Sequence, residues 1–253
     1  MAVETVREIL YGRQPVRECL RARRRHAHQL ILAEGASKKG VVGEILGLAV
    51  GLKLPVKRVP RPQLDRIAKA HQGVALEVAG YLYVEVAEIQ SRARRLGEQP
   101  FILALDHLQD PQNLGALLRT AEVAGVHGAL LPSRRAAGVT PAVVSASAGA
   151  TEHLRVAQVT NLARTLQLLK TDGLWVVGLE SRPDALPYHQ IDLDLPLILV
   201  VGAEDRGLSR LVREMCDMIV QVPMWGQIES LNASVAGGIV MYAALAARGF
   251  SAE

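Results

Sequence analysis

The sequence has few cysteines, few aromatic residues and no apolar run long enough to span a bilayer. Its two cysteines, Cys19 and Cys216, lie far apart and match no metal-ligand spacing, which argues against a zinc site and favours a reduced compartment. Phe, Trp and Tyr make up 4% of the residues, which disfavours an RNA-binding sheet that stacks bases on aromatic rings. The longest apolar stretch, Leu231–Ala247, is rich in small residues and predicts a buried helix.

Two nucleotide-binding signatures are also missing. The chain contains no Gly-x-Gly-x-x-Gly and no Gly-x-x-x-x-Gly-Lys-Ser/Thr, so a dinucleotide site and a P-loop lose their main support. The first residues show no basic segment followed by an apolar run, so we expect no secretory signal. These absences together predict a cytoplasmic protein that binds no metal and does not enter a membrane.

Charge is divided unevenly along the chain. Residues 1–98 hold 18 Lys and Arg against 10 Asp and Glu, whereas residues 99–253 hold 11 against 15. This asymmetry favours a first half that binds a polyanion, although a merely solvated basic surface is the alternative. Forked guanidinium groups suit phosphate oxygens, so we expect nucleic-acid contacts from the densest cluster. That cluster consists of Arg21, Arg23, Arg24 and Arg25.

The pattern of apolar residues predicts two α/β domains. Residues 1–86 alternate helical and strand patterns, which predicts a small α/β sandwich. Its strands are expected at Gln29–Ala33, Val56–Val59 and Val74–Val86. Residues 87–99 are polar and turn-prone and are interpreted as a linker. Residues 100–253 form the second domain.

Near-continuous apolar runs recur in the second domain. They lie at Phe101–Leu105, Gly128–Leu131, Leu174–Leu179, Leu197–Val201 and Met218–Val222, with helical patterns between them. Because such runs are typical of strands buried on both faces, they predict a parallel sheet with helices on each side. In sheets of this kind, ligands bind at the loops beyond the carboxyl ends of the strands.

Three of these loops carry unusual residues. The first has Asn-x-Gly-x-x-x-Arg at Asn113–Arg119, where Asn113 is expected to be a helix N-cap. The second has Gly-x-Glu-x-x-Gly at Gly202–Gly207, where a glycine after a buried strand permits a tight turn and the close approach of a ligand. The third has Pro-Met-x-Gly-x-x-x-Ser-Leu-Asn-x-Ser at Pro223–Ser234. Taken singly, each loop also fits an ordinary helix cap or turn.

Taken in this order, the three loops closely resemble the three motifs of the SpoU (TrmH-like) family of the SPOUT RNA methyltransferase superfamily. The resemblance covers residues 101–248. It extends to the N-terminal half through Tyr11-Gly-Arg-x-Pro-Val and His71-Gln-Gly-Val-Ala, which resemble the substrate-binding domain of RlmB-type enzymes. It implies an S-adenosylmethionine-dependent RNA 2′-O-ribose methyltransferase that acts on a guanosine of 23S rRNA. It further implies a homodimer and a deep trefoil knot in the C-terminal domain.

The resemblance also assigns site residues. The cofactor-binding positions that it implies are Leu179, Gly202, Val222, Met224, Ser230 and Leu231. The catalytic positions that it implies are Asn113, Arg119, Glu204 and Asn232. The motif-one arginine is proposed to act as a base in similar enzymes, but a guanidinium group is always protonated in proteins. We therefore expect Arg119 to be a cation that clamps an RNA phosphate and stabilises the developing alkoxide.

The other three catalytic positions have supporting roles in this hypothesis. Asn113 and Asn232 would position Arg119 and the ribose, and Glu204 would orient its loop, pair with Arg119 or accept a proton through water. Two alternatives within the class are a tRNA guanosine or an rRNA adenosine as the target. Outside the class, the chain would be a ribosome-assembly RNA binder without catalysis, which the intact motif residues disfavour.

Overall fold

The computed structural model describes residues 6–37, 39–204 and 206–249. They form two compact units. The first unit contains the described residues up to Leu82 together with Val139–His153, and the second contains Tyr83–Gly138 and the residues from Leu154 onward. The change of unit at Leu82 lies close to the domain boundary expected near residue 86. Nothing in the sequence pattern predicted that Val139–His153 would pack with the first unit.

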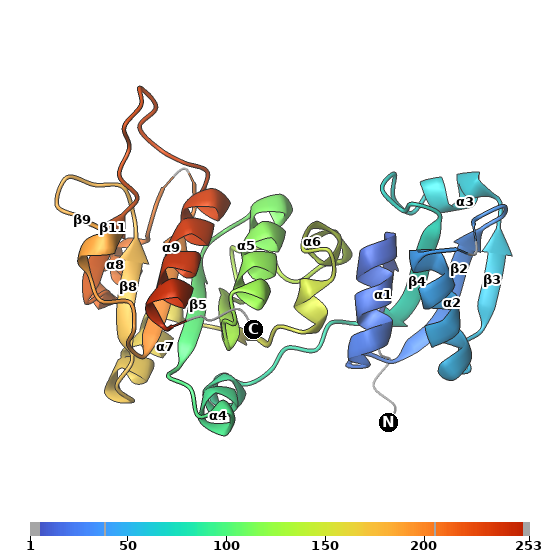
Figure 1. Cartoon of the computed structure of the whole chain (residues 1–253), viewed down its shortest axis with the longest axis horizontal. Coiled ribbons are helices and arrows are strands. Elements are labelled where there is room, and N and C mark those ends of the chain that lie inside the picture. Colours follow the sequence, from blue (N-terminus) through green and yellow to red (C-terminus); the bar gives the residue numbers. More distant parts are fainter. Residues whose placement is uncertain (1–5, 38, 205, 250–253) are drawn as a thin grey trace. The chain divides into compact units, whose positions relative to one another are not determined.

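A four-stranded sheet forms the centre of the first unit. Its strands are β1 (Arg7–Tyr11), β2 (Ala27–Ala33), β3 (Val56–Val59) and β4 (Val74–Ala79), in the spatial order β1-β4-β2-β3. Figure 1 shows β4, β2 and β3 side by side. Strand β4 pairs antiparallel with β1 and β2, and β2 pairs parallel with β3. The three strands expected here are confirmed, although the third ends at Ala79 rather than at Val86. Strand β1 was not predicted.

Three helices cross between the strands of the first unit. They are α1 (Arg13–Ala22), α2 (Val41–Gly51) and α3 (Arg61–Asp65). Helix α1 buries Val16, Cys19 and Leu20 at helical spacing, so one apolar stripe faces the core and the arginines lie on the other side. Pro62 lies in the first turn of α3, where its missing N–H removes no helix hydrogen bond.

The two N-terminal segments that resemble the substrate-binding domain meet in space. The backbone N–H of Arg13 donates to Oε1 of Gln72 at 3.1 Å, and its Nε donates to the carbonyl of Gln72 at 3.2 Å. The ring of His71 is fully buried, accepting at Nδ1 from the N–H of Gly73 at 2.8 Å and lying 2.9 Å from Asp65 at Nε2. These residues therefore hold the turn before β4 against the start of α1, which is a structural role.

One of the four arginines expected to contact nucleic acid is part of the core of the first unit. The side chain of Arg25 is 1% exposed and forms a hydrogen-bonded pair with Glu152, which is equally buried. Its Nη1 also donates to Glu8 at 2.8 Å. Burial alone would lower the pKa of Arg25, but its bonds to Glu152 raise it, so Arg25 stays a cation. Because both hydrogen-bonding edges of the guanidinium group are occupied, Arg25 is a structural residue. The expectation that it contacts nucleic acid is therefore corrected.

The partner of Arg25 comes from a distant part of the chain. Glu152 ends a short 3₁₀ turn, η1 (Ala150–Glu152), which follows helix α6 (Pro141–Ala146). Both elements pack on the first unit, and Figure 1 shows α6 beside α1. Gly149 precedes the turn with φ +88°, and a Cβ there would lie 2.8 Å from the side chain of Glu18. This close approach requires glycine.

A seven-stranded sheet forms the centre of the second unit, and every pairing in it is parallel. The spatial order is β7-β6-β5-β10-β8-β11-β9. The strands are β5 (Phe101–Asp106), β6 (Gly128–Pro132), β7 (Val156–Val159), β8 (Trp175–Leu179), β9 (Leu186–Pro187), β10 (Leu197–Gly202) and β11 (Met218–Gln221). All five apolar runs noted in the sequence are strands of this sheet, whereas β7 and β9 were not predicted.

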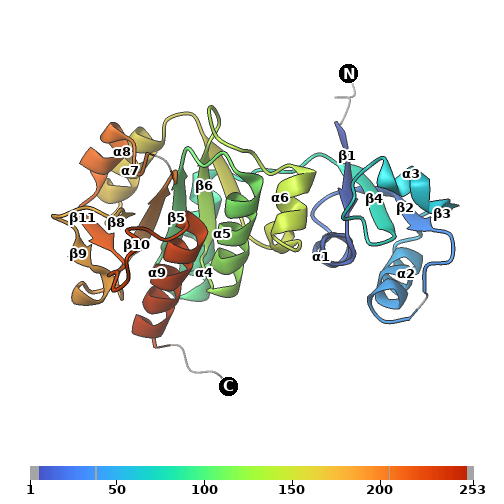
Figure 2. The same ribbon diagram turned by 90° about the horizontal axis from the view of Figure 1, so that it is seen from above.

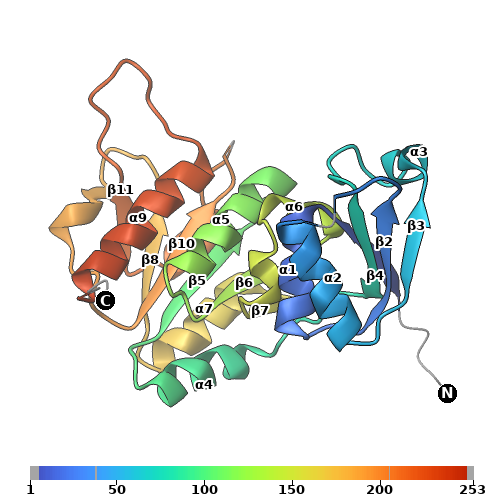
Figure 3. The same cartoon turned by 45° about the vertical axis from the view of Figure 1, so that its right-hand side comes forward.

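Helices cover both faces of this sheet, as expected. One face carries α4 (Val86–Leu96), α7 (Leu162–Thr171) and α8 (Arg210–Met215), whose buried residues share one apolar cluster with the strands. The other carries α5 (Pro111–Val123) and α9 (Ala233–Ala247), which pack against each other (Figures 2 and 3). A Cβ on Gly237 of α9 would lie 2.5 Å from Leu117 of α5, so the small residue is what allows this contact.

The stretch interpreted as a linker is mostly helix. Residues 87–99 include nearly all of α4, which buries Ile89 and Ala93 four positions apart. Most of its other residues are charged or polar. The segment therefore resembled an irregular connection in composition, although it has a narrow apolar stripe. Gly97 ends the helix with φ +70°. The predicted trefoil knot stays a prediction. Within the described residues, no helix has the length and apolar character needed to cross a bilayer.

Candidate active site

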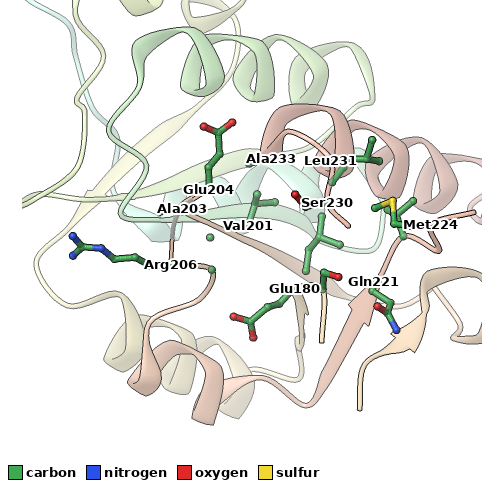
Figure 4. A pocket seen from close by; sticks show the side chains of 16 residues that line it. Glu180, Val201, Ala203, Glu204, Arg206, Gln221, Met224, Ser230, Leu231 and Ala233 are labelled. Atoms are coloured by element: carbon green, nitrogen blue, oxygen red, sulfur yellow. The ribbon is translucent and has the colours of Figure 1, made fainter. Parts of the chain in front are cut away.

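The six residues expected to bind the cofactor surround a single cavity at the carboxyl ends of β8, β10 and β11. The cavity has a volume of about 340 Å³ (Figure 4). Leu179 ends β8 and Gly202 ends β10, while Val222, Met224, Ser230 and Leu231 belong to the segment after β11. Parallel strands bring their carboxyl ends to one edge of a sheet, so residues far apart in the sequence meet there. Their role in binding a cofactor stays a prediction.

The loop after β10 forms one wall of this cavity, and its two glycines fit against each other. A Cβ on Gly202 would lie 2.3 Å from the carbonyl carbon of Gly207. Gly207 has φ +62°, and its N–H donates to the carbonyl of Ala203 at 2.9 Å. The expectation that Gly202 permits a tight turn is therefore met, but the group that approaches it is the backbone of Gly207. In Figure 4, Glu204 and Arg206 leave this loop in different directions.

Glu180 lines the same cavity and was missed in the sequence. It follows β8 directly, and both its carboxylate oxygens accept hydrogen bonds from Arg213 at 2.8 Å. It also accepts from the N–H of Leu208 at 3.1 Å. Burial would raise the pKa of Glu180, but these bonds outweigh it and lower the pKa. A Cβ on Gly207 would lie 2.2 Å from this carboxylate, so the glycine makes room for it. Its position at a strand end was the only available signal.

Three of the four predicted catalytic residues meet beside the cavity. Nδ2 of Asn113 donates to Oε1 of Glu204 at 2.7 Å. Nδ2 of Asn232 donates to the same carboxylate oxygen and, at 2.9 Å, to Oδ1 of Asn113. We call Asn113, Glu204 and Asn232 the motif triad, because each of the three sequence motifs contributes one member. Two amide donors on one carboxylate hold Glu204 in a fixed orientation.

Helix starts place two members of the motif triad. Asn232 is the N-cap of α9, and its Oδ1 accepts from the N–H of Ser234 at 2.8 Å, which leaves Nδ2 for the triad. Asn113 was expected to cap α5, and that expectation was wrong. The N-cap is Asp110, whose carboxylate accepts from the N–H groups of Gln112 and Asn113. Asp110 leaves the Asn113 side chain, 8% exposed, free to turn toward Glu204.

The fourth predicted catalytic residue, Arg119, does not join the motif triad. It lies on α5 with an exposed side chain, six residues after Asn113, and therefore points to a different side of the helix. No hydrogen bond or ion pair links it to Asn113, Glu204 or Asn232 within residues 6–37, 39–204 and 206–249. The expected pairing of Arg119 with Glu204 is therefore not observed.

The remaining arginines of the basic cluster lie on the first unit. Arg21 is exposed at the end of α1, within 3.5 Å of Glu18 and Glu44. Arg23 and Arg24 line a cavity of about 280 Å³ together with His26. Arg23 ends α1 in the left-handed conformation, with φ 53°. Arg25 lines the same cavity, but its side chain is 1% exposed, whereas Arg21 and Arg23 are exposed and Arg24 is partly buried.

The cavity beside β10 fits an adenosine-containing cofactor in its chemistry. Val201, Val222, Met224 and Leu231 supply apolar surface for a flat ring system. Glu180 supplies a carboxylate at one side. No group of three or more His, Cys, Asp or Glu side chains able to hold a metal occurs among the residues that the structure describes.

Comparison with known families decides what this arrangement is. Residues 100–242 match the model of the SpoU rRNA methylase family. The chain belongs to that family. Residues 9–84 match a second model, described as the substrate-binding domain of RNA 2′-O-ribose methyltransferases. The SpoU chain is thus an RNA 2′-O-methyltransferase that uses S-adenosylmethionine.

Relatives cover nearly the whole SpoU chain. It is 44% identical to YacO of Bacillus subtilis, named as a TrmH family tRNA/rRNA methyltransferase, over 93% of this chain and 94% of that protein. A protein of the same designation from Staphylococcus saprophyticus is 40% identical over 92% and 93% of the two chains.

Solved structures share the fold. A crystal structure described as an RNA 2′-O-ribose methyltransferase superposes with a TM-score of 0.76 at 26% identity, over 96% of this chain and 89% of that one. The SpoU methyltransferase AviRb from Streptomyces viridochromogenes, solved with AdoMet, gives a TM-score of 0.79 at 22% identity, over 96% and 90%. At that identity AviRb supports the fold alone. Both matches support the α/β fold class expected from the sequence.

Proposed function

We propose that this enzyme methylates the ribose 2′-oxygen of a guanosine in 23S rRNA, with the motif triad as the centre of its active site. The observation that carries the proposal is the meeting of Asn113, Glu204 and Asn232 at the edge of the cavity assigned to the cofactor. Glu204 lines that cavity and also accepts from both amides. A side chain held in this way fixes the edge where cofactor and ribose must meet.

Methyl transfer to a ribose requires above all that the hydroxyl oxygen and the methyl group be aligned. When bound, S-adenosylmethionine supplies a methyl group on a sulfonium centre, which is already a good leaving group. The residues of this chain have to hold the ribose hydroxyl in line with it and stabilise charge on the oxygen. The amide of Asn113 and the carboxylate of Glu204 are polar groups with fixed orientations at that edge. They are suited to hold a sugar hydroxyl in one position.

The hydroxyl proton needs an acceptor, and Glu204 is the triad member that can take it. One of its oxygens receives both amide donors, and no donor to the other is recorded among the described residues, so that oxygen can accept from a hydroxyl or from a bridging water. Arg119 cannot act as a base because its guanidinium group keeps its proton. Its role in the proposal is that of a cation for an RNA phosphate.

The proposal includes a homodimer. Arg119 and Val123 lie four residues apart on α5 and therefore share one side of the helix. Val123 is 59% exposed, and α9 exposes Val235 and Tyr242, each at 49%. Apolar side chains exposed on two packed helices are suited to an interface with a second copy, which would bring Arg119 into that interface. A cytoplasmic location is likewise part of the proposal, and both cysteines are free thiols.

The first unit is proposed to bind the RNA. Arg21, Arg23 and Arg24 form its cationic cluster, with His26 beside them. Guanidinium groups supply affinity for phosphates without reading sequence, so the first unit would hold the RNA while the second chooses the reacting ribose. Its match to a substrate-binding family supports this division.

The RNA class is the open part of the proposal. The relatives carry the designation tRNA/rRNA methyltransferase, and AviRb is one of several solved SpoU structures. A folded substrate-binding unit favours rRNA over tRNA. The alternatives are a tRNA guanosine and an rRNA adenosine.

The test compares RNA substrates directly. The enzyme is incubated with labelled S-adenosylmethionine and with unmodified transcripts of 23S rRNA and of a mixed tRNA set. We expect label in the 23S transcript, and primer extension at low nucleotide concentration should stop at one guanosine. Label confined to tRNA would contradict the rRNA assignment, and label at an adenosine would contradict the guanosine assignment. A protein that labels neither RNA would contradict the proposed function.

A further inference from the structure

A second and larger cavity lies beside the one assigned to the cofactor. Its volume is about 590 Å³, and it shares four lining residues with the first cavity. The shared residues are Ala203, Glu204, Arg206 and Gly207. Asn113 of the motif triad lines the second cavity but not the first. The loop after β10, with its carboxylate Glu204, is therefore a partition with the cofactor cavity on one side and a separate polar space on the other.

The second cavity contains a histidine that lies outside the three sequence motifs given above. His107 follows β5, and its Nδ1 lies 2.5 Å from Oδ1 of Asp106. Asp106 is 1% exposed, and its other oxygen accepts from the N–H of Ser209 at 2.6 Å. With the Asp106 carboxylate as acceptor, Nδ1 carries the hydrogen, and among the residues that the structure describes none is recorded against Nε2, which we assign to another group. A buried carboxylate that is itself fixed by a backbone N–H and holds an imidazole with its other oxygen is a way of orienting a functional ring.

The backbone at this histidine is also unusual. His107 has φ 58°, in the left-handed region that residues other than glycine adopt uncommonly, although Asn, Asp and His do so more often than the rest. Such a conformation costs about 1 to 3 kcal/mol and occurs most often at functional sites. Arg135, which also lines the cavity, has φ 57° and an exposed side chain. The two residues that would present an imidazole and a cation to this space are thus both held in strained conformations.

We propose that the second cavity receives the target nucleotide, that His107 is a positioning residue which hydrogen-bonds that nucleotide through Nε2, and that Arg135 binds its phosphate. This inference rests on the proposed function and names the part of the chain that holds the substrate. The reacting 2′-oxygen would then lie at the partition, next to Glu204, where both cavities meet.

The chemistry of the walls fits a nucleotide. Two guanidinium groups, those of Arg135 and Arg206, suit a phosphate, and the imidazole of His107 suits a polar edge of a base or a sugar. The three acidic residues in the walls have other partners: Asp106 binds His107 and Ser209, Asp110 caps α5, and Glu204 accepts from Asn113 and Asn232. A cavity of this volume lies within the range of natural small-ligand pockets, about 300 to 1,000 Å³.

The strained backbone makes a clean substitution available. His107→Gly removes the imidazole at a position whose φ glycine adopts freely, so relief of backbone strain offsets part of the stability lost with the hydrogen bond to Asp106. His107→Asn is the conservative partner, because asparagine tolerates this φ and its amide retains one donor and one acceptor. For the phosphate, Arg135→Gln is compared with Arg134→Gln, an exposed neighbour that does not line the cavity.

The assay measures methyl transfer to the unmodified transcript that the wild type labels, with KM for RNA and kcat determined separately. Binding of S-adenosylhomocysteine is measured by calorimetry. We expect His107→Gly to raise KM for RNA about tenfold, roughly the loss of one good hydrogen bond, with kcat and cofactor affinity unchanged. His107→Asn should recover part of that loss. Arg135→Gln should raise KM by a few-fold and reduce the salt dependence, and Arg134→Gln should do neither.

Two results would overturn this assignment. One is an unchanged KM for RNA in His107→Gly. The other is an equal effect of the Arg134 and Arg135 substitutions. A failure of the proposed function is distinguishable, because the wild type would then label neither RNA. A fall in kcat of more than a hundredfold in His107→Gly, with KM unchanged, would also overturn the positioning role, because it would assign the imidazole to the chemical step.

Discussion

Asn232 has two separable roles, which allows a sharp test of the motif triad. Its Oδ1 caps α9 by accepting from the N–H of Ser234, and its Nδ2 donates to Glu204 and to Asn113. Asn232→Asp keeps an excellent cap and removes the donor. Asn232→Ser keeps a cap as well and introduces no charge. Asn232→Ala loses both roles.

The magnitudes follow from the contacts. Loss of an N-cap costs about 1 kcal/mol, so only Asn232→Ala should loosen the start of α9. A hydrogen bond to a charged group contributes about 1.5 to 3 kcal/mol, and the donor lost in all three variants binds the Glu204 carboxylate. Asn232→Asp also brings a second carboxylate against Glu204, which adds repulsion. We therefore expect a loss in kcat of about tenfold to a hundredfold for Asn232→Ser and a larger one for Asn232→Asp.

The two roles have separate readouts. Hydrogen exchange at the amides of Ser234 and Val235 reports the cap, because both donate to Asn232. Single-turnover methyl transfer reports the triad. The expected pattern is slow exchange with poor transfer in Asn232→Asp, and fast exchange with poor transfer in Asn232→Ala. If Asn232→Asp transferred methyl groups at the wild-type rate, the triad would have no catalytic role.

Three further outcomes are expected. Glu152→Gln should lower the free energy of unfolding by about 3 kcal/mol, because it leaves the buried charge of Arg25 without its full partner. Denaturant melts of the whole chain measure this, and unchanged stability would mean that Arg25 is solvated. Gly207→Ala should weaken S-adenosylhomocysteine binding at least tenfold by calorimetry, because a Cβ there collides with Glu180; full affinity would contradict the described loop. Burial lowers the pKa of His127 below 6.5 despite the carboxylate beside it, so protonation of His127 favours the unfolded state. The melting temperature should therefore fall as the pH drops below about 6.5, and it should fall less steeply in His127→Gln. Equal pH slopes for the two proteins would refute this.

Much of the second unit could be predicted from its sequence, because strands buried on both faces leave continuous apolar runs. Leu197–Gly202, with all six residues buried, is the clearest case. Strand β9, two residues long, leaves no such signal. Composition misled at residues 87–99, where a narrow apolar stripe within charged residues forms α4. Charge alone could not show that Arg25 is buried, because its partner Glu152 lies 127 residues away in the sequence.

The candidate site was predictable only as a set of residues. Motif spacing placed Asn113, Glu204 and Asn232 on three loops, and the register of a parallel sheet brings those loops together. The sequence offered both Asp110 and Asn113 as N-caps of α5. In the structure the cap is Asp110, whose side chain accepts from two N–H groups. His107 left no sequence signal, because its proposed role depends on its hydrogen bond to the buried Asp106 carboxylate, which the sequence does not show.

The central claim is that the cavities on either side of Glu204 bring a methyl donor against a ribose hydroxyl. The most direct measurement is the chemical identity of the product. RNA labelled by the enzyme from methyl-labelled S-adenosylmethionine is digested to nucleosides and separated by chromatography with mass spectrometry. The account predicts that all of the label elutes as a 2′-O-methylated nucleoside whose methyl group stays with the ribose after the base is cleaved. A methyl group that leaves with the base would contradict it.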